Sequence, residues 1–259
     1  MFLEYYSPIL YRFWCQITPT SLRVAKGNRM IRDYVESTLT QDDISEFTLA
    51  ARLRELKEVP RELAVAECLD HLGAGIETTG DVLCFLMWEL SQPRNEARMN
   101  KLHEEFLDMR SEPLHTRPYL GAVIQEALRL WAPGSLPLPR YVPDDGRNMD
   151  GYFLPGHTIV GCQSYTLHRN EIVFPNPNEF APERWLDPNG SSERQRWNFS
   201  FGLGARTLEM RALLHAVYSK YRTRPAKDMI ADMSMYDQVL TSRPKDMCCL
   251  LAFEVYDAT

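Results

Sequence analysis

The sequence predicts a mainly α protein with a small β-sheet region. Apolar residues recur at helical spacing through most of residues 1–131, which indicates a helical body. Residues 132–197 carry prolines, glycines and short apolar runs, which are typical of short strands and an ordered loop. Residues 198–259 return to a helix and end in an apolar strand. We expect a single domain over residues 1–259, since a chain of this length can bury a sizeable core.

Two helices are expected early in the chain. Residues 28–39 and 42–56 place apolar side chains at helical spacing, and Asp42 and Asp43 are candidate caps for the second helix. The opening stretch, "MFLEYYSPILYRFW", is crowded with aromatic and aliphatic side chains without clear polar alternation. It is interpreted either as a core segment or as a patch that touches a membrane or a partner.

The longest helical pattern runs over residues 61–92, between two prolines. Its centre, "GAGIETTG", contains glycines and threonines that disfavour helix interiors, so we expect a local distortion of the hydrogen-bond ladder. One interpretation is a functional site. The other is a close helix crossing, where small residues let two backbones approach.

A further helix is predicted over "YLGAVIQEALRLWAPG". One face carries an apolar stripe, formed by Leu120, Val123, Ile124, Ala127, Leu128 and Trp131. Glu126 and Arg129 lie three residues apart on the other side. Spacing alone makes them a weak exposed ion pair that contributes less than about 1 kcal/mol.

The β region is expected within residues 132–197. "YFLPGHTIV" predicts two short strands around a Pro-Gly turn. The following stretch, "FPNPNEFAPERWLDPNGSS", is too proline-rich for regular structure, yet its aromatic residues favour burial. We then expect a helix from about Leu208 to Tyr221 and a terminal strand near "DMCCLLAFEVY".

Composition excludes several classes of protein. A net charge of -6 with no long basic run argues against nucleic-acid binding. The cysteines lack the spacings of a zinc site or a disulfide scaffold, which favours a reducing compartment. No apolar stretch reaches the roughly eighteen residues that a membrane-spanning helix needs.

Four motifs, in this order, resemble those of the haem-thiolate monooxygenases, the cytochrome P-450 family. "AGIETT" is similar to the family's oxygen-activation motif, and "EALR" matches its E-x-x-R. "FAPERW" is similar to the P-E-R-F segment, and "FSFGLGART" matches the start of the haem-binding loop, F-x-x-G-x-R-x-C-x-G. Together they point to a cytochrome P-450-like fold, and their style resembles the fungal branch that serves specialised metabolism.

The resemblance changes what is expected of two pairs of residues. Glu77 and Thr78 match the acid–alcohol pair that relays protons in the family. Glu126 and Arg129 would be buried with Arg184, where loss of one charge costs about 3 to 5 kcal/mol because its partners stay desolvated.

The resemblance also implies a cofactor-binding set. Arg140 and Arg206 match arginines that reach toward the haem propionates, a contact suited to guanidinium groups. Phe201 and Gly204 match the haem loop.

The sequence departs from the family at the residue that matters most for haem. Leu208 stands where the family has the cysteine whose thiolate ligates iron and promotes O–O cleavage. The alignment implies that about eight residues of this segment are missing, including the ligand. His215 is a candidate replacement, but a neutral imidazole lacks the electron push of a thiolate, and a solvated or core histidine is the alternative interpretation. We therefore expect no haem and no metal in this chain, although haem is the cofactor of the parent family.

The chain is also expected to be truncated at its front, since its start resembles the middle of family members. One wall of the substrate pocket would then be missing, and the exposed apolar face predicts self-association or a partner protein. An apolar small molecule is the other expected partner. We expect a cytoplasmic location, with peripheral contact at the endoplasmic reticulum through the aromatic opening segment.

These observations favour a family member that is inactive as a monooxygenase and descends from an enzyme that hydroxylated an apolar small molecule. Two alternatives stay open. One is a haem-free cavity that catalyses an isomerisation or cyclisation in a biosynthetic pathway, since positioning alone contributes several kcal/mol. The other is a non-catalytic interaction subunit.

Overall fold

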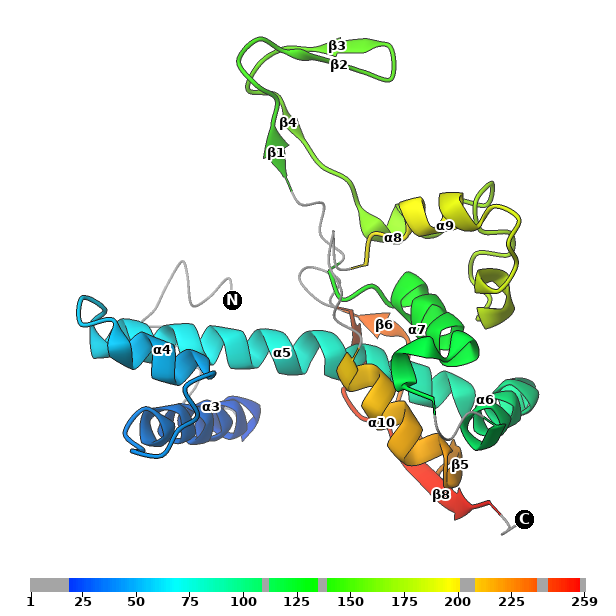
Figure 1. Cartoon of the computed structure of the whole chain (residues 1–259), viewed down its shortest axis with the longest axis horizontal. Coiled ribbons are helices and arrows are strands. Elements are labelled where there is room, and N and C mark those ends of the chain that lie inside the picture. Colours follow the sequence, from blue (N-terminus) through cyan, green and yellow to red (C-terminus); the bar gives the residue numbers. More distant parts are fainter. Residues whose placement is uncertain (1–18, 109–111, 135–138, 201–207, 237–241, 257–259) are drawn as a thin grey trace. The chain divides into compact units, whose positions relative to one another are not determined.

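The structure is a computed structural model, and its helices outnumber its strands (Figure 1). It describes residues 19–108, 112–134, 139–200, 208–236 and 242–256. Two compact units divide the chain, residues 1–75 and residues 76–259. Within the described residues, all strands belong to the second unit and form two-stranded antiparallel pairs. The predicted mainly α class with a small β region is confirmed.

The first unit contains α3 (Pro19–Thr38), α4 (Leu49–Glu55) and the amino-terminal half of α5 (Arg61–Leu90). Its core is a cluster of small and aliphatic side chains, namely Val35, Leu39, Ala50, Ala64 and Val65. These residues come from all three helices, so the unit is held by helix-on-helix packing.

The predicted caps of the second helix, Asp42 and Asp43, are wrong. Helix α4 begins later, at Leu49, and Thr48 is its N-cap. The Thr48 side chain accepts a hydrogen bond from the backbone N–H of Ala51 at 3.2 Å. This bond satisfies one of the first N–H groups of the helix, which the aspartates are too far upstream to reach.

The predicted distortion of the long helix is also wrong. Helix α5 is α-helical from Arg61 to Leu90, without a break at the glycines. A Cβ added at Gly73, Gly75 or Gly80 would meet no described atom within 4 Å outside its own stretch of helix. No described backbone therefore approaches these glycines closely enough to be the proposed helix crossing.

The second unit is built on the carboxyl-terminal half of α5. It shares its core with α6 (Glu96–Asp108), α7 (Pro118–Leu130) and α10 (Leu208–Tyr218). The short element η1 (Pro93–Asn95) contacts α6, and η2 (Leu114–Thr116) contacts α7 and α10. The buried side chains of this core include Leu86, Leu90, Leu102, Phe106, Leu120, Ile124, Met210 and Leu214. The apolar stripe predicted on α7 faces this core, which confirms the interpretation of its spacing.

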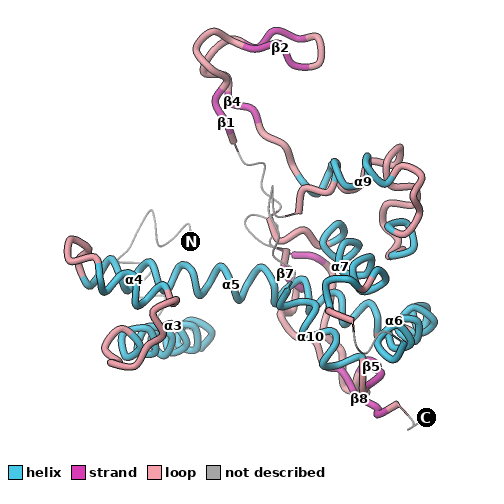
Figure 2. Tube along the Cα trace, viewed as in Figure 1, coloured by secondary structure: helices cyan, strands magenta, loops and turns pink. Residues whose placement is uncertain are grey.

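A long hairpin follows α7 (Figure 2). Its strands are β1 (Arg140–Tyr141), β2 (Arg147–Met149), β3 (Tyr152–Leu154) and β4 (Ile159–Val160). The strands predicted on either side of the Pro-Gly turn are confirmed as β3 and β4. They do not pair with each other, because β3 pairs with β2 and β4 pairs with β1.

The turn between β2 and β3 explains this pairing. Asp150 and Gly151 connect the two strands, and both have positive φ angles, of 49° and 84°. Two central residues with positive φ suit a two-residue hairpin, because this backbone twist matches that of the flanking strands. The Asp-Gly pair therefore closes β2 on β3 directly.

The proline-rich segment after β4 contains only short helices. These are α8 (Ser164–Leu167), η3 (Pro182–Trp185) and α9 (Ser191–Trp197). Element η3 lies against α7, so this segment covers the helix that carries Glu126. The expectation of an ordered loop with buried aromatics is supported by Phe174 and Phe180, which are both buried.

Two strand pairs complete the chain. Strand β5 (Tyr221–Pro225) pairs with β8 (Leu251–Val255), and β6 (Met235–Tyr236) pairs with β7 (Arg243–Pro244). The predicted terminal strand is confirmed as β8. Among the described residues, no helix is both long and apolar enough to cross a membrane.

Candidate functional site

Glu126 is at the centre of a buried polar cluster. Glu126 and Arg129 are fully buried on α7 and form two parallel hydrogen bonds of 2.9 and 2.8 Å. Arg184 Nε and Trp185 Nε1 donate to the same carboxylate at 3.1 and 2.8 Å, and the backbone N–H of Ala181 donates at 2.9 Å. The carboxylate is thus paired with charge and hydrogen-bonded on both oxygens, which is what a buried charge requires.

Arg129 reaches beyond Glu126 to the backbone of the following loop. Its Nη1 donates to the carbonyls of His168 and Pro177 at 2.8 and 2.6 Å, and its Nη2 donates to Glu179 at 3.1 Å. One guanidinium therefore holds three carbonyls of a segment that has little regular structure. The sequence-based expectation from spacing, a weak exposed pair, does not describe this cluster.

His168 links α7 to the segment that leads into the glycine-containing loop. Its Nδ1 lies 3.0 Å from the carbonyl oxygen of Arg129, and its Nε2 accepts the N–H of Phe199 at 2.8 Å. Because Nε2 is an acceptor, the proton must sit on Nδ1 and the ring is neutral. Burial lowers the pKa of His168 to about 4, which agrees with this neutral state.

Sequence reasoning did not single out His168 or Trp185. Both lie in the irregular segment after the hairpin, where no periodicity indicates which face is buried. The only available signal was their position inside the motif-bearing stretch "HRNEIVFPNPNEFAPERW". Their contacts depend on how that segment folds over α7.

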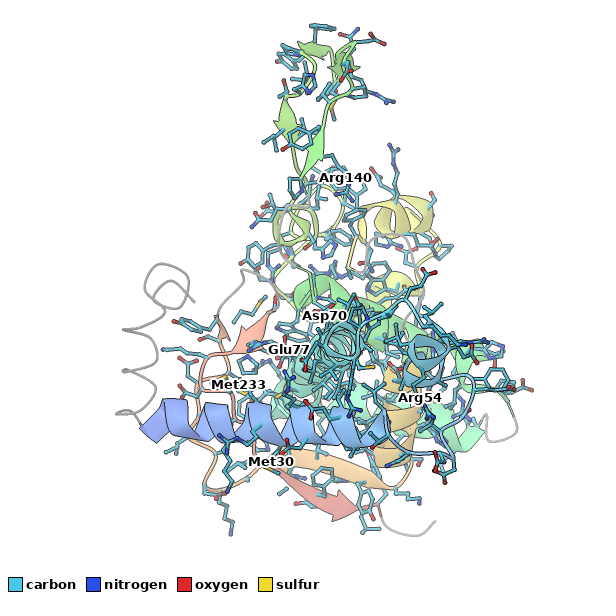
Figure 3. All side chains as sticks on the ribbon, turned by 90° about the vertical axis from the view of Figure 1, so that its left-hand side faces the viewer. Met30, Arg54, Asp70, Glu77, Arg140 and Met233 are labelled. Atoms are coloured by element: carbon cyan, nitrogen blue, oxygen red, sulfur yellow. The ribbon has the colours of Figure 1, made fainter. Side chains whose placement is uncertain are left out.

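Glu77 and Thr78, the predicted proton-relay pair, lie on α5, and Figure 3 labels Glu77. Arg243 Nη2 lies 2.7 Å from the Glu77 carboxylate, and its Nε lies 3.5 Å from Asp81 one turn further on. Burial raises the pKa of Asp81, and the Arg243 charge opposes that shift. The Glu77 carboxylate is thus engaged in an ion pair, and Thr78 beside it is half-buried.

Arg140, predicted to reach a propionate, begins β1 and is exposed (Figure 3). Its Nη1 donates to the carbonyl of the preceding Pro139 at 3.0 Å. The other predicted cofactor-binding residues, Phe201, Gly204 and Arg206, lie outside the described residues. Of the predicted cofactor-binding set, the described residues contain Arg140 alone.

The donor set at the expected ligand position does not fit a haem thiolate. Leu208 is the first residue of α10, and no cysteine occurs in the sequence between Cys162 and Cys248. The cysteines that the structure describes lie outside α10. No cluster of three or more His, Cys, Asp or Glu side chains that could hold a metal occurs within the described residues.

His215, the candidate replacement ligand, is half-buried on α10 and packs against the helical core. Its ring meets the ring of Phe106 edge-on, with the centroids 5.0 Å apart. Burial, and then the charges of Arg117 and Lys220, lower the pKa of His215. This contact accounts for the position of His215 without a role as an iron ligand.

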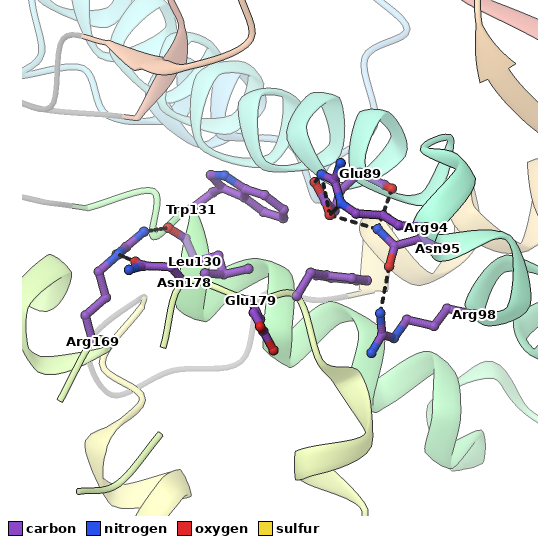
Figure 4. Close-up of a pocket in the computed structure, with 10 residues that line it drawn as sticks. Glu89, Arg94, Asn95, Arg98, Leu130, Trp131, Arg169, Asn178 and Glu179 are labelled. Carbon is purple, nitrogen blue, oxygen red and sulfur yellow. Dashed lines mark hydrogen bonds and ion pairs between the residues drawn. The ribbon is translucent and has the colours of Figure 1, made fainter. Parts of the chain in front are cut away.

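A polar cavity of about 370 Å³ lies beside the end of α5 (Figure 4). It is lined by Glu89, Arg94, Asn95, Arg98, Leu130, Trp131, Arg169, Asn178, Glu179 and Phe180. The arginines in its wall already bind acceptors of the protein: Arg94 binds Glu89 at 2.8 Å, and Arg98 binds Asn95 at 2.8 Å. These contacts brace the wall of the cavity.

Known proteins resemble the chain in sequence and in fold. The family model "Cytochrome P450" matches residues 24–250. The chain is 44% identical over 121 residues to the cytochrome P450 monooxygenase orf2 of Aspergillus niger, covering 46% of this chain and 25% of that protein. It is 36% identical over 191 residues to the cytochrome P450 monooxygenase ankB of Aspergillus thermomutatus, covering 66% and 35%.

A solved structure shares the fold at low identity. The retinoic acid-bound cyanobacterial CYP120A1 superposes with a TM-score of 0.68 and 19% identity, covering 91% of this chain and 58% of that one. The chain spans about a quarter to a half of the length of the curated relatives it matches. Because the family model matches residues 24–250, this chain belongs to the cytochrome P450 family.

Proposed function

We propose that this chain is a cytochrome P450-family protein without monooxygenase activity. The observation that carries the proposal is Leu208, which stands at the position where the resemblance requires the iron-ligating cysteine. A thiolate is what supplies the electron push for O–O cleavage in haem-thiolate enzymes. No cysteine occurs elsewhere in the loop or on α10, so the chain lacks this donor where it would be needed.

The state of Glu77 supports the same proposal. Its carboxylate lies 2.7 Å from the Arg243 guanidinium, so the group that the motif assigns to proton transfer is engaged in an ion pair. We propose that Glu77 and Thr78 are retained from an active ancestor and do not relay protons in this chain.

The ancestral activity is proposed from the relatives. The relatives compared above are fungal proteins named as cytochrome P450 monooxygenases. We propose descent from a monooxygenase of fungal specialised metabolism that acted on an apolar small molecule. The chain keeps the cluster around Glu126 that supports the fold and lacks the donor that supports the chemistry.

A visible spectrum tests the proposal directly. The full chain is produced with haem supplied, reduced, exposed to carbon monoxide and compared with the Aspergillus niger relative orf2 prepared in the same host. We expect a thiolate-type Soret band from the relative and none from this chain. A thiolate-type band from this chain, with hydroxylated products from apolar test compounds, would refute the proposal.

A variant of the chain tests the cause. Leu208→Cys returns a sulfur to the expected position without changing the helix that follows. A thiolate-type band in this variant, absent from the parent, would attribute the loss to the missing donor. The same variant without a band would mean that the shortened loop also prevents haem binding, which is compatible with the proposed inactivity.

A further inference from the structure

Two cysteines that are distant in the sequence line the same cavity of the second unit. Cys84 lies on α5, and Cys249 lies just before β8. The interaction between the two thiols raises the pKa of Cys84 and lowers the pKa of Cys249. Both thiols are free and half-buried.

A cavity gives small molecules access to this pair. Its volume is about 470 Å³, and it is lined by Cys84, Met87, Ala226, Asp228, Cys249, Leu250, Leu251 and Phe253. Both sulfur-bearing residues line the same cavity, so one small oxidant can reach either of them. The two thiols are therefore accessible to small molecules, although both are half-buried.

We propose that Cys84 and Cys249 are an oxidation site, at which hydrogen peroxide converts the thiol pair into a disulfide that joins α5 to the β8 segment. The Cys249 sulfur attacks one peroxide oxygen, the O–O bond breaks, and a sulfenic acid and one water form. The Cys84 sulfur then attacks the sulfenic sulfur, and the S–S bond forms as a second water leaves. Two thiols lose two electrons and two protons, and one peroxide becomes two waters.

The order of attack follows from the opposite pKa shifts of the two thiols. The interaction with Cys84 lowers the pKa of Cys249. The interaction with Cys249, together with burial and the nearby Asp81 charge, raises the pKa of Cys84. Since the thiolate is the nucleophile, Cys249 reacts with peroxide first and Cys84 resolves the sulfenic acid.

The neighbouring Cys248 is the natural competitor for Cys249. It is exposed, and consecutive residues have Cα atoms about 3.8 Å apart across a trans peptide. That separation is shorter than the roughly 4.4 to 6.8 Å that disulfides prefer. A bond between Cys248 and Cys249 is therefore disfavoured, and Cys248 provides a matched control.

Peptide mapping of the full folded chain tests the proposal. The parent and the variants Cys84→Ser, Cys249→Ser and Cys248→Ser are treated with hydrogen peroxide, alkylated and digested without reduction. We expect a linked peptide containing Cys84 and Cys249 in the parent and in Cys248→Ser, with a loss of two titratable thiols per chain that dithiothreitol reverses. In Cys84→Ser and in Cys249→Ser, we expect no such linked peptide and no reversible loss of two thiols.

The parent alone decides the outcome if a serine variant fails to fold. A linked Cys248–Cys249 peptide, or peroxide oxidation of Cys84 and Cys249 to separate sulfinic acids, would overturn the proposal. So would the same mixture of pairings in the folded and the urea-unfolded parent, because the fold would then not direct which cysteines are joined.

Discussion

Arg243 binds Glu77 across the second unit, with 2.7 Å between Nη2 of the arginine and the carboxylate. Glu77 lies on α5 and Arg243 begins β7, so a residue from near the end of the chain occupies the carboxylate that the motif marks for proton transfer. Asp81, 3.5 Å from the same guanidinium, is the second acidic partner. The free energy of the interaction between Arg243 and Glu77 can therefore be measured by substituting each residue.

A double-mutant cycle with Glu77→Gln and Arg243→Gln should give a modest coupling energy. The side chains are 50% and 31% exposed, so water and salt screen their attraction. We expect a coupling of less than about 1 kcal/mol in urea unfolding, and a smaller value at high salt. A coupling of several kcal/mol that is insensitive to salt would contradict this description of a screened ion pair.

Removing the charge of Arg129 should be far more destabilising. Arg129→Ala leaves the fully buried carboxylate of Glu126 without its closest cation, and the expected loss of unfolding free energy is about 3 to 5 kcal/mol. Arg224→Ala is the control in the same unit, since Arg224 pairs with Glu96 and Glu254 at half-exposed positions. We expect a change of less than about 1 kcal/mol there. Equal losses in the two variants, measured by urea unfolding, would show that burial does not determine the cost.

His168 should make stability depend on pH in the acidic range. Its pKa is lowered to about 4 in the folded chain from 6.5, so the unfolded chain takes up the proton first as the pH falls. The stabilisation is fully present above about pH 6.5 and is lost as the pH falls toward about 4, by about 3 kcal/mol in all. Unfolding free energies measured across this range in the parent and in His168→Gln test the expectation.

The variant His168→Gln should flatten the slope because the amide does not titrate. His115→Gln, which changes an exposed histidine of the same unit, should leave the slope as it is in the parent. If His168→Gln kept the full slope, the acid sensitivity would belong to other groups.

A buried hydroxyl network should tolerate substitution poorly. Thr223 Oγ1 lies 2.6 Å from Ser91 Oγ and 3.0 Å from Tyr218 Oη, which joins the end of α5, the end of α10 and strand β5. Thr223→Val keeps the shape but leaves two buried hydroxyls without this partner, so we expect a loss of about 1 to 3 kcal/mol. Thr116→Val, at an exposed position, is the control, and thermal unfolding compares the two. A neutral Thr223→Val variant would mean that the remaining hydroxyls find other partners.

The local pattern of the sequence accounts for most of the helices. Prolines bound α5, and the apolar stripe of α7 predicts which face meets the core. Helix formation and amphipathicity depend on residues three and four apart, so a local sequence contains this information. The missing cysteine at Leu208 is likewise a matter of sequence alone, because it concerns which residue type is present.

Contacts between distant residues could not be predicted in the same way. The spacing of Glu126 and Arg129 is that of the exposed pair Arg52 and Glu55, yet the first pair is fully buried and the second is more than 60% exposed. Periodicity also gave no sign that Arg243 would bind Glu77. The spacing along a helix is the same in water and in a core, and only the segments that fold over that helix decide whether a charge loses its solvent and which partner replaces it.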